Sequence, residues 1–184
     1  FLNYGYSDNS RPELNNEDEN NRYSIQLYSH ITNSIKLDGL DVLEVGCGRG
    51  GGASYVARYL NPNSIRGVDI CKKSIDFCNE HYDAQGLSFS YGDAVNLPFT
   101  NDNFDIVINV ESSHRYSDMG RFLAEVCRVL KPGGYFLFAD LRDEELIEPL
   151  RKKLSACRLK ITKEETITPG VLKALTLDNK KKMN

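Results

Sequence analysis

The sequence has 184 residues, a length that suits one α/β domain with a sizeable buried core. Its net charge of −3 and pI of about 5.7 argue against a nucleic-acid binder, which usually carries a strong basic excess or stripe. No apolar run approaches the roughly 18 to 20 residues of a membrane span, and the five cysteines show no C-x-x-C pairing. We therefore expect a cytoplasmic protein without a membrane span, a metal site or a disulfide framework.

The front of the chain differs in composition from the rest. Residues 1–22 are polar and rich in Asn and Glu, apart from a cluster of aromatic residues within positions 1–6. Residues 9–21 are predicted to form a loop. We predict an N-terminal lid or loop segment over residues 1–22 and a single domain over residues 23–184.

Helical and strand-like stretches alternate along the domain. Apolar side chains at close to helical spacing predict a first helix over residues 22–37. Strands are expected at Asp41–Val45, residues 65–70, Leu87–Tyr91, Phe104–Val110 and residues 135–139. Further helices are expected at residues 53–60, 72–82, 119–130 and Glu144–Ala156. The alternation implies right-handed βαβ units, so we predict an α/β fold with a doubly wound, mostly parallel sheet and helices on both faces. Beyond residue 157 the pattern weakens, and we expect a strand over residues 159–168 and a short helix over residues 170–177.

The first predicted strand runs into a glycine-rich turn. Gly46, Gly48 and Gly50 alternate there and let the backbone turn sharply and approach a ligand without an intervening Cβ. With Gly51 the turn also satisfies the G-x-G-x-x-G dinucleotide fingerprint. Asp69 closes the next strand about twenty residues later, where doubly wound nucleotide folds place a carboxylate on the ribose hydroxyls. Together these features predict an adenosine-type ligand.

Three further features favour S-adenosylmethionine over a dinucleotide. Glu44 precedes the first glycine in an otherwise apolar strand, where a carboxylate needs a cation or hydrogen-bond donors. The amino group of a methionine moiety meets that need, whereas a pyrophosphate would be repelled. Asp93 ends the third predicted strand, where it can accept a hydrogen bond from an adenine amino group. The Lys-Pro-Gly-Gly turn at residues 131–134 is not a regular feature of dehydrogenases.

An ordered set of motifs resembles class I S-adenosylmethionine-dependent methyltransferases over residues 40–140. The motifs are VLEVGCGRG at 42–50, GVD at 67–69, GDAVNLPF at 92–99, FD at 104–105 and VLKPGG at 129–134. The flanking segments are similar to the mycobacterial phthiotriolone and phenolphthiotriolone dimycocerosate O-methyltransferases and to polyketide-type O-methyltransferases of small molecules. The family's sheet ends with an antiparallel strand pair whose final strand is not evident after residue 160. We therefore expect C-terminal strands to be missing and the C-terminus to be incomplete.

The resemblance implies S-adenosylmethionine as the cofactor and S-adenosylhomocysteine as its product. The predicted cofactor-binding residues are Tyr4, Tyr6, Glu44, Gly46, Cys47, Gly48, Gly50, Asp69, Ile70, Asp93, Ala94 and Asn109. We expect Tyr4 and Tyr6 to fold over the cofactor as an aromatic lid that excludes water. The alternative for them is a disordered terminus, the usual fate of polar chain ends.

The end of the fourth predicted strand faces the transferred methyl group in this fold. His114 follows it, and an imidazole can be neutral near neutral pH, so we predict His114 as the general base. Glu111 is predicted to orient that ring and to stabilise the imidazolium. The alternative is a loop histidine without a catalytic part, while His30 and His81 lie on predicted helices and are taken as structural. The Asp/Asn-Pro-Pro-aromatic turn of enzymes that methylate nucleobase nitrogens is absent from this strand end.

These residues predict methyl transfer to a hydroxyl of a small lipid-like or polyketide-like acceptor. One alternative is C-methylation of a sterol, quinone or polyketide carbon, for which the same two bases would serve. Another is a non-catalytic module that binds an adenosyl ligand, although its loop and Asp69 are intact. A nicotinamide dehydrogenase would need a second domain, for which the chain has no room. The sequence does not predict the oligomeric state.

Overall fold

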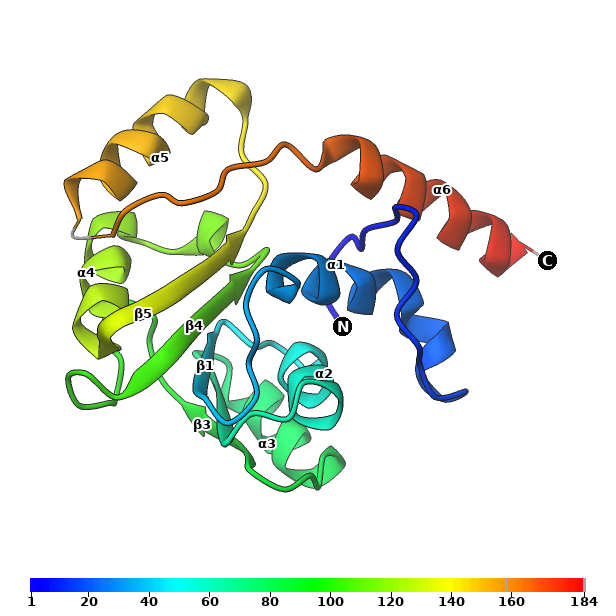
Figure 1. The fold of residues 1–184 in the computed structure, drawn as a ribbon, viewed down its shortest axis with the longest axis horizontal. Helices are drawn as coiled ribbons and strands as arrows, with labels where there is room; N and C mark the ends of the chain where they lie inside the picture. Colours follow the sequence, from blue (N-terminus) through cyan, green and yellow to red (C-terminus); the bar gives the residue numbers. More distant parts are fainter. Residues whose placement is uncertain (158, 184) are drawn as a thin grey trace.

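The computed structural model describes residues 1–157 and 159–183, which build a five-stranded sheet with helices on both faces (Figure 1). The strands are β1 (Asp41–Val45), β2 (Ser64–Asp69), β3 (Leu87–Tyr91), β4 (Phe104–Val110) and β5 (Leu130–Ala139). Their order is β3-β2-β1-β4-β5, and all neighbouring pairs are parallel. The predicted doubly wound, parallel α/β fold is confirmed. Its strand order reverses beside β1, and ligands of such sheets bind beyond the carboxyl ends of the strands at that point.

The helices follow the predicted alternation, with shifted ends. They are α1 (Arg22–Thr32), α2 (Gly51–Tyr59), α3 (Lys72–His81), α4 (Met119–Val129), α5 (Glu144–Ala156) and α6 (Thr168–Met183). Two short 3₁₀ helices, η1 (Asp18–Asn21) and η2 (Ser113–Arg115), precede α1 and α4. The first helix ends five residues earlier than the predicted residue 37, and residues 33–35 form turns before the buried Leu37.

Two apolar cores lie on opposite faces of the sheet because successive strand residues point to opposite sides. Val42, Ile106 and Ile108 pack under α1 and α2, whereas Leu43 and Val107 pack under α4. This two-sided burial explains why β4 reads as a nearly continuous apolar run.

The turn predicted at residues 131–134 lies within β5, where it interrupts the regular pairing of β5 with β4. Phe104 pairs with Leu130, but Ile106 already pairs with Tyr135, so four residues of β5 bulge out of register. Gly133 has a φ of 82° there, a conformation that glycine adopts without strain.

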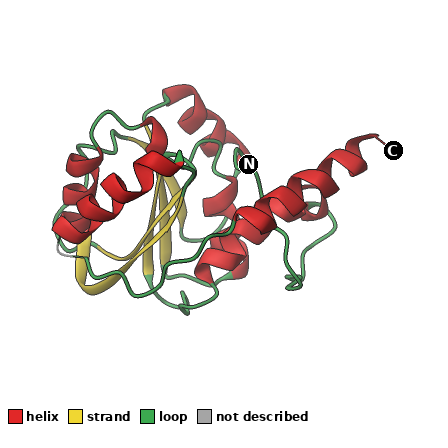
Figure 2. Cartoon of the chain, turned by 90° about the horizontal axis from the view of Figure 1, so that it is seen from above, coloured by secondary structure: helices red, strands yellow, loops and turns green. Residues whose placement is uncertain are grey.

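The strand expected over residues 159–168 is wrong, because residues 159–167 form an irregular connector between α5 and α6. Alternating apolar residues produced the strand-like pattern, yet residues 159–167 pair with none of the described strands. Its apolar contacts are at its ends, with Leu159 against one core and Ile167 against the other, while Ile161 is 43% exposed. The helix that follows, α6, is longer than predicted and projects beyond the sheet layers (Figure 2).

The N-terminal segment and α6 meet beside α1 (Figure 1). The Ser7 amide donates to the Gly170 carbonyl at 3.1 Å, and the Tyr6 ring packs at a tilt against His30 with 4.2 Å between ring centroids. Within the described ranges, no helix combines the length and apolar character needed to cross a bilayer. Among the same residues, no group of three or more His, Cys, Asp or Glu side chains could hold a metal ion.

Candidate active site

The glycine turn between β1 and α2 forms the floor of the candidate site. Gly46, Gly48 and Gly50 have φ values of 73°, 53° and 73°, the left-handed conformation that favours glycine. The amides of Gly46 and Cys47 both donate to the Val68 carbonyl, at 2.8 and 3.1 Å, so the turn lies against β2. Side chains at these glycines would collide with neighbours; a Cβ on Gly50 would lie 2.8 Å from the Phe89 ring. The backbone is therefore exposed to a ligand at a point where side chains are excluded.

The carboxylate predicted for the ribose hydroxyls lies directly at this turn. Asp69 Oδ2 accepts from the Gly48 amide at 2.8 Å, and Oδ1 accepts from the Cys71 amide at 2.8 Å. Each oxygen retains a further lone pair for a ligand. Ile70, next in the chain, is 61% exposed, so an apolar side chain stands uncovered beside the carboxylate.

The third strand ends in a similar acidic turn. Asp93 Oδ1 accepts from the Val95 amide at 3.0 Å, and the neighbouring Ala94 is buried. Because β3 lies next to β2, this turn belongs to the same edge of the sheet as Asp69.

Glu44 is a buried carboxylate at the end of β1, with 1% of its surface exposed. The Tyr28 hydroxyl donates to its Oε1 at 2.5 Å. Among the described residues, Oε2 has no hydrogen-bond partner. Burial raises the pKa of Glu44 to about 7, against the lowering effects of the Tyr28 hydroxyl and the Ala53 amide. An incompletely satisfied buried carboxylate oxygen is costly, and a cationic or hydrogen-bond-donating ligand group would relieve that cost.

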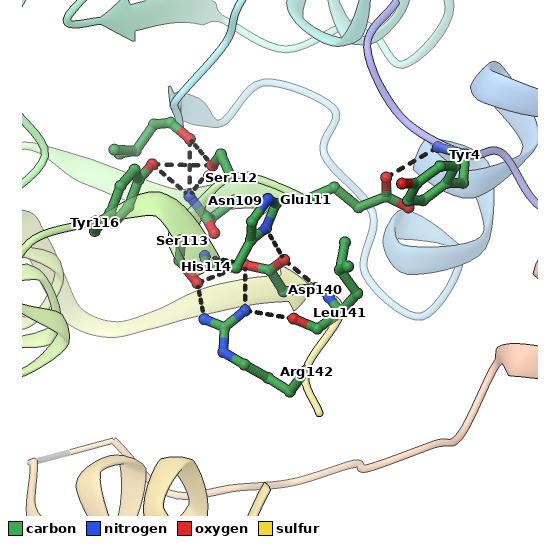
Figure 3. A network of polar contacts seen from close by, with 11 residues as sticks. Tyr4, Asn109, Glu111, Ser112, Ser113, His114, Tyr116, Asp140, Leu141 and Arg142 are labelled. Atoms are coloured by element: carbon green, nitrogen blue, oxygen red, sulfur yellow. Dashed lines mark hydrogen bonds and ion pairs between the residues drawn. The ribbon is translucent and has the colours of Figure 1, made fainter. Parts of the chain in front are cut away.

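A polar network joins the end of β4 to the glycine turn (Figure 3). Asn109 is fully buried; its Nδ2 donates to the Val45 carbonyl at 2.9 Å and lies 2.8 and 2.9 Å from the hydroxyls of Ser112 and Tyr116. Those two hydroxyls lie 2.9 Å apart, and a Cβ on Gly46 would collide with both. Asn109 Oδ1 has no partner in the described part of the chain. The network thus holds the strand end against the loop, a role of Ser112 and Tyr116 that the sequence did not reveal.

His114 lies on η2, directly beyond the end of β4. Its Nδ1 is 2.7 Å from Oδ1 of Asp140, whose side chain is fully buried just after β5. Asp140 Oδ2 accepts from the Ser113 hydroxyl at 2.6 Å and from the His114 amide at 3.0 Å. Burial opposes ionisation, but these hydrogen bonds and the Arg142 charge hold the pKa of Asp140 below its usual value. The ring is therefore oriented by an ionised carboxylate while part of it stays open to solvent.

The predicted orientation of His114 by Glu111 is wrong. Glu111 has a φ of 46°, and its side chain points away from the imidazole toward the N-terminal segment, where Oε2 accepts from the Tyr4 amide at 2.9 Å (Figure 3). Burial raises the pKa of Glu111, against the hydrogen bond from Tyr4. The parallel pairing of β4 and β5, which joins Val110 to Ala139, brings Asp140 to the histidine. A carboxylate at the end of the neighbouring strand was the signal that could have identified it.

The N-terminal segment contacts the glycine turn, but through Phe1 and Leu2 rather than through the predicted Tyr4 and Tyr6. Leu2 lies over Gly48 and Phe1 over Gly51, each within 2.9 Å of where a Cβ would stand. Tyr4 is 55% exposed. Tyr6 is buried between α1 and α6 and is not among the side chains that the structure brings to the turn.

Comparison with known proteins gives the arrangement a context. A family model described as a methyltransferase domain matches residues 43–138. The chain is 45% identical over 177 residues to a fatty-acid O-methyltransferase of Mycolicibacterium smegmatis, covering 95% of this chain and 65% of that protein. It is 43% identical over 183 residues to a phthiotriol/phenolphthiotriol dimycocerosates methyltransferase of Mycobacterium tuberculosis, covering 98% of this chain and 68% of that protein. The chain thus spans about two thirds of the length of these curated relatives.

Solved structures share the fold at lower identity. The crystal structure of the [4+2]-cyclase SpnF matches with a TM-score of 0.73 and 24% identity, over 96% of this chain and 73% of that one. A putative sarcosine dimethylglycine methyltransferase from Galdieria sulphuraria matches with a TM-score of 0.65 and 20% identity, over 84% and 62%. Since one of the two is a cyclase, the fold alone does not define the reaction, and function has to be argued from the site.

Proposed function

The chain belongs to the methyltransferase domain family, and we propose that it transfers the methyl group of S-adenosylmethionine to an oxygen atom of a small lipid-like acceptor. The observation that carries the proposal is the contact between His114 and the buried Asp140, beyond the ends of β4 and β5. It supplies an oriented proton acceptor at the strand ends where a doubly wound sheet binds its ligand.

The residues around the turn fit the proposed cofactor. The glycines have positive φ values and no side chain, so a ligand can approach the backbone of the turn closely. Asp69 offers its two carboxylate oxygens to the vicinal hydroxyls of a ribose. The unsatisfied Oε2 of Glu44 fits the need of an ammonium group for a buried anion. Asp93 would accept from the adenine amino group. Ile70 and Ala94 would pack against the ring, and Asn109 would keep the strand end in place.

When bound, the cofactor would supply an electrophilic methyl group on a sulfonium, with the thioether of S-adenosylhomocysteine as the leaving group. His114 removes the acceptor proton at Nε2, because its Nδ1 is engaged by Asp140. A carboxylate can only accept there, so it holds the proton on Nδ1 and stabilises the imidazolium that forms. Alignment of the reacting groups is the other contribution of the protein.

Apolar surface near the base supports a lipid-like acceptor. Leu141 directly follows Asp140 and is 43% exposed, and Leu146 on α5 is 46% exposed. None of the described side chains of α5 is buried. The relatives described above carry the names of lipid methyltransferases, which agrees with an acceptor that needs such surface.

The proposal is tested by incubating the chain with methyl-labelled S-adenosylmethionine and a panel of fatty acids, long-chain alcohols and phenols. We expect label in an ester or ether of an apolar acceptor, together with binding of S-adenosylhomocysteine in calorimetry. Label on carbon would replace the proposal with C-methylation. Binding of S-adenosylhomocysteine without transfer to any acceptor class would favour a non-catalytic adenosyl-binding module.

A further inference from the structure

The side chain of Tyr28 connects the first long helix to the buried carboxylate at the end of β1. Tyr28 lies on α1 and is 6% exposed, and its hydroxyl donates to Glu44 Oε1 at 2.5 Å. Glu44 Oε2 has no hydrogen-bond partner among the described residues. One oxygen of the carboxylate is therefore fixed from α1, and the other is left for a group that the described residues do not supply.

A glycine in the first turn of α2 makes room for this contact. A Cβ on Gly52 would overlap ring carbons and the hydroxyl oxygen of Tyr28. Any other residue at position 52 would therefore push the ring and its hydroxyl away from Glu44. Glycine is a poor helix former, second only to proline, so its place in α2 has a cost that the close approach of Tyr28 explains.

Tyr28 is the donor in this hydrogen bond. Burial and the Glu44 charge raise the pKa of the Tyr28 hydroxyl, so the proton stays on its oxygen. The bond in turn opposes the effect of burial on Glu44, because a hydrogen bond to the charged form lowers the pKa of a carboxyl group. Tyr28 therefore favours the anionic form of Glu44, which is the form that attracts a cation.

Other titratable groups also face Glu44, from the turn, β2, α3 and the front of the chain. Besides burial, the Asp69 charge opposes ionisation of Glu44, whereas the terminal ammonium group of Phe1 favours it. The remaining groups that feel the Glu44 charge are Cys47, Cys78 and Tyr82. Within the described part of the chain, Tyr28 is the side chain that donates a hydrogen bond to Glu44, so its hydroxyl is the group to remove in a test.

We propose that Tyr28 is a positioning residue of the cofactor site, which fixes the Glu44 carboxylate so that its Oε2 receives the ammonium group of the ligand's amino-acid part. The inference rests on the proposed function, because S-adenosylmethionine and its product both carry that ammonium group. The apparent affinity then scales with the fraction of protein in which Glu44 is ionised. Since the pKa of Glu44 is about 7, loss of the Tyr28 hydroxyl lowers this fraction near and below neutral pH and changes it little well above pH 7.

The test measures by calorimetry how the full chain binds two ligands at about pH 6.5 and about pH 9. S-adenosylhomocysteine carries the ammonium group, whereas methylthioadenosine has the same adenosine thioether without the amino-acid part. Tyr28→Phe removes only the hydroxyl, and Gly52→Ala displaces the ring while keeping it. Tyr59→Phe is the matched control, because the Tyr59 hydroxyl also donates to a carboxylate at 2.5 Å, that of Asp18, at the end of α2 remote from the glycine turn.

We expect Tyr28→Phe and Gly52→Ala to bind S-adenosylhomocysteine at least about fivefold more weakly than the wild type at pH 6.5, and within about twofold of it at pH 9. Both variants should bind methylthioadenosine within about twofold of the wild type at either pH, and Tyr59→Phe should bind both ligands as the wild type does. In Tyr28→Phe, an unchanged affinity for S-adenosylhomocysteine, a loss that is the same at both pH values, or an equal loss for methylthioadenosine would overturn the inference. If the wild-type chain does not bind S-adenosylhomocysteine at all, the proposed function fails instead.

Discussion

The two halves of the candidate site are built in different ways. The cofactor half uses Glu44, the glycine turn and Asp69, which lie within 26 consecutive residues of two adjacent strands. The acceptor half joins Tyr4 to Glu111 and His114 to Asp140, contacts that span 107 and 26 residues of sequence. The first half depends on local backbone geometry, whereas the second depends on strand pairing and on the docking of the chain's front. The halves should therefore respond differently to substitution.

The largest expected effect lies in the acceptor half, on turnover alone. His114→Ala removes the proposed base and should lower turnover of a hydroxyl acceptor by about 10² to 10⁴, the usual share of general base catalysis. Binding of S-adenosylhomocysteine should stay nearly unchanged, because His114 is outside the glycine turn. Steady-state kinetics and calorimetry on the same preparation separate the two readouts. Retention of most of the turnover would mean that alignment of the reactants alone carries the reaction.

A somewhat smaller loss is expected when the orienting carboxylate is neutralised. Asp140→Asn keeps the size of the side chain but no longer stabilises the imidazolium, and we expect turnover to fall about 10- to 1000-fold. Steady-state kinetics measures the change. Glu111→Gln is the matched control, since that carboxylate accepts a hydrogen bond from the Tyr4 amide rather than from the ring. A larger loss of turnover in Glu111→Gln than in Asp140→Asn would reverse the assignment.

This contrast also explains how much could be read from the sequence. The sheet, the glycine turn and Asp69 were predictable because each depends on short-range spacing: glycines at a strand end and an acid at the end of the next strand. Asp140 was not identified, because its contact with His114 exists only once β4 and β5 pair in register. Glu111 misled, because three residues of separation suggest proximity while its left-handed backbone turns the side chain away. Tyr6 was predicted to cover the cofactor but is buried against α1. An aromatic residue that covers a ligand and one that packs in the core look alike in sequence.

In the cofactor half, the corresponding substitution should act on affinity. Asp69→Ala removes charge-assisted hydrogen bonds and should weaken binding of S-adenosylhomocysteine by about 1.5 to 3 kcal/mol. Part of this loss would come from the turn itself, because Asp69 also accepts from the Gly48 amide. Calorimetry measures the change, and Asp93→Ala serves as a comparison at the adjacent strand end. Equal affinity in the wild type and Asp69→Ala would remove Asp69 from the cofactor site.

Glu44 should link the cofactor half to stability. Its folded-state pKa of about 7 lies above the ordinary value of 4.5, so the folded protein favours the protonated form. The stability this provides is complete below pH 4.5 and is lost as the pH rises through 7. Glu44→Gln should therefore raise the free energy of unfolding of the ligand-free protein at pH 8 by about 1 to 3 kcal/mol and change it little at pH 5. Denaturant titrations at both pH values measure this, and a Glu44→Gln variant that is destabilised at pH 8 would show that the carboxylate is fully satisfied without a ligand.

The smallest effect concerns the place where the two halves meet, under the front of the chain. Leu2 lies over Gly48 although 73% of its surface is exposed, so a ligand bound beneath it would bury more of its side chain. If the N-terminal segment covers the bound cofactor, Leu2→Ala should weaken binding of S-adenosylhomocysteine by about 0.5 to 1 kcal/mol, the contribution of partly buried methyl groups. Leu172→Ala is the matched control, because Leu172 is also exposed, at 59%, but lies on α6. Tighter binding in Leu2→Ala would show instead that the leucine occupies the cofactor's place and has to be displaced, which would make the segment a competitor rather than a cover.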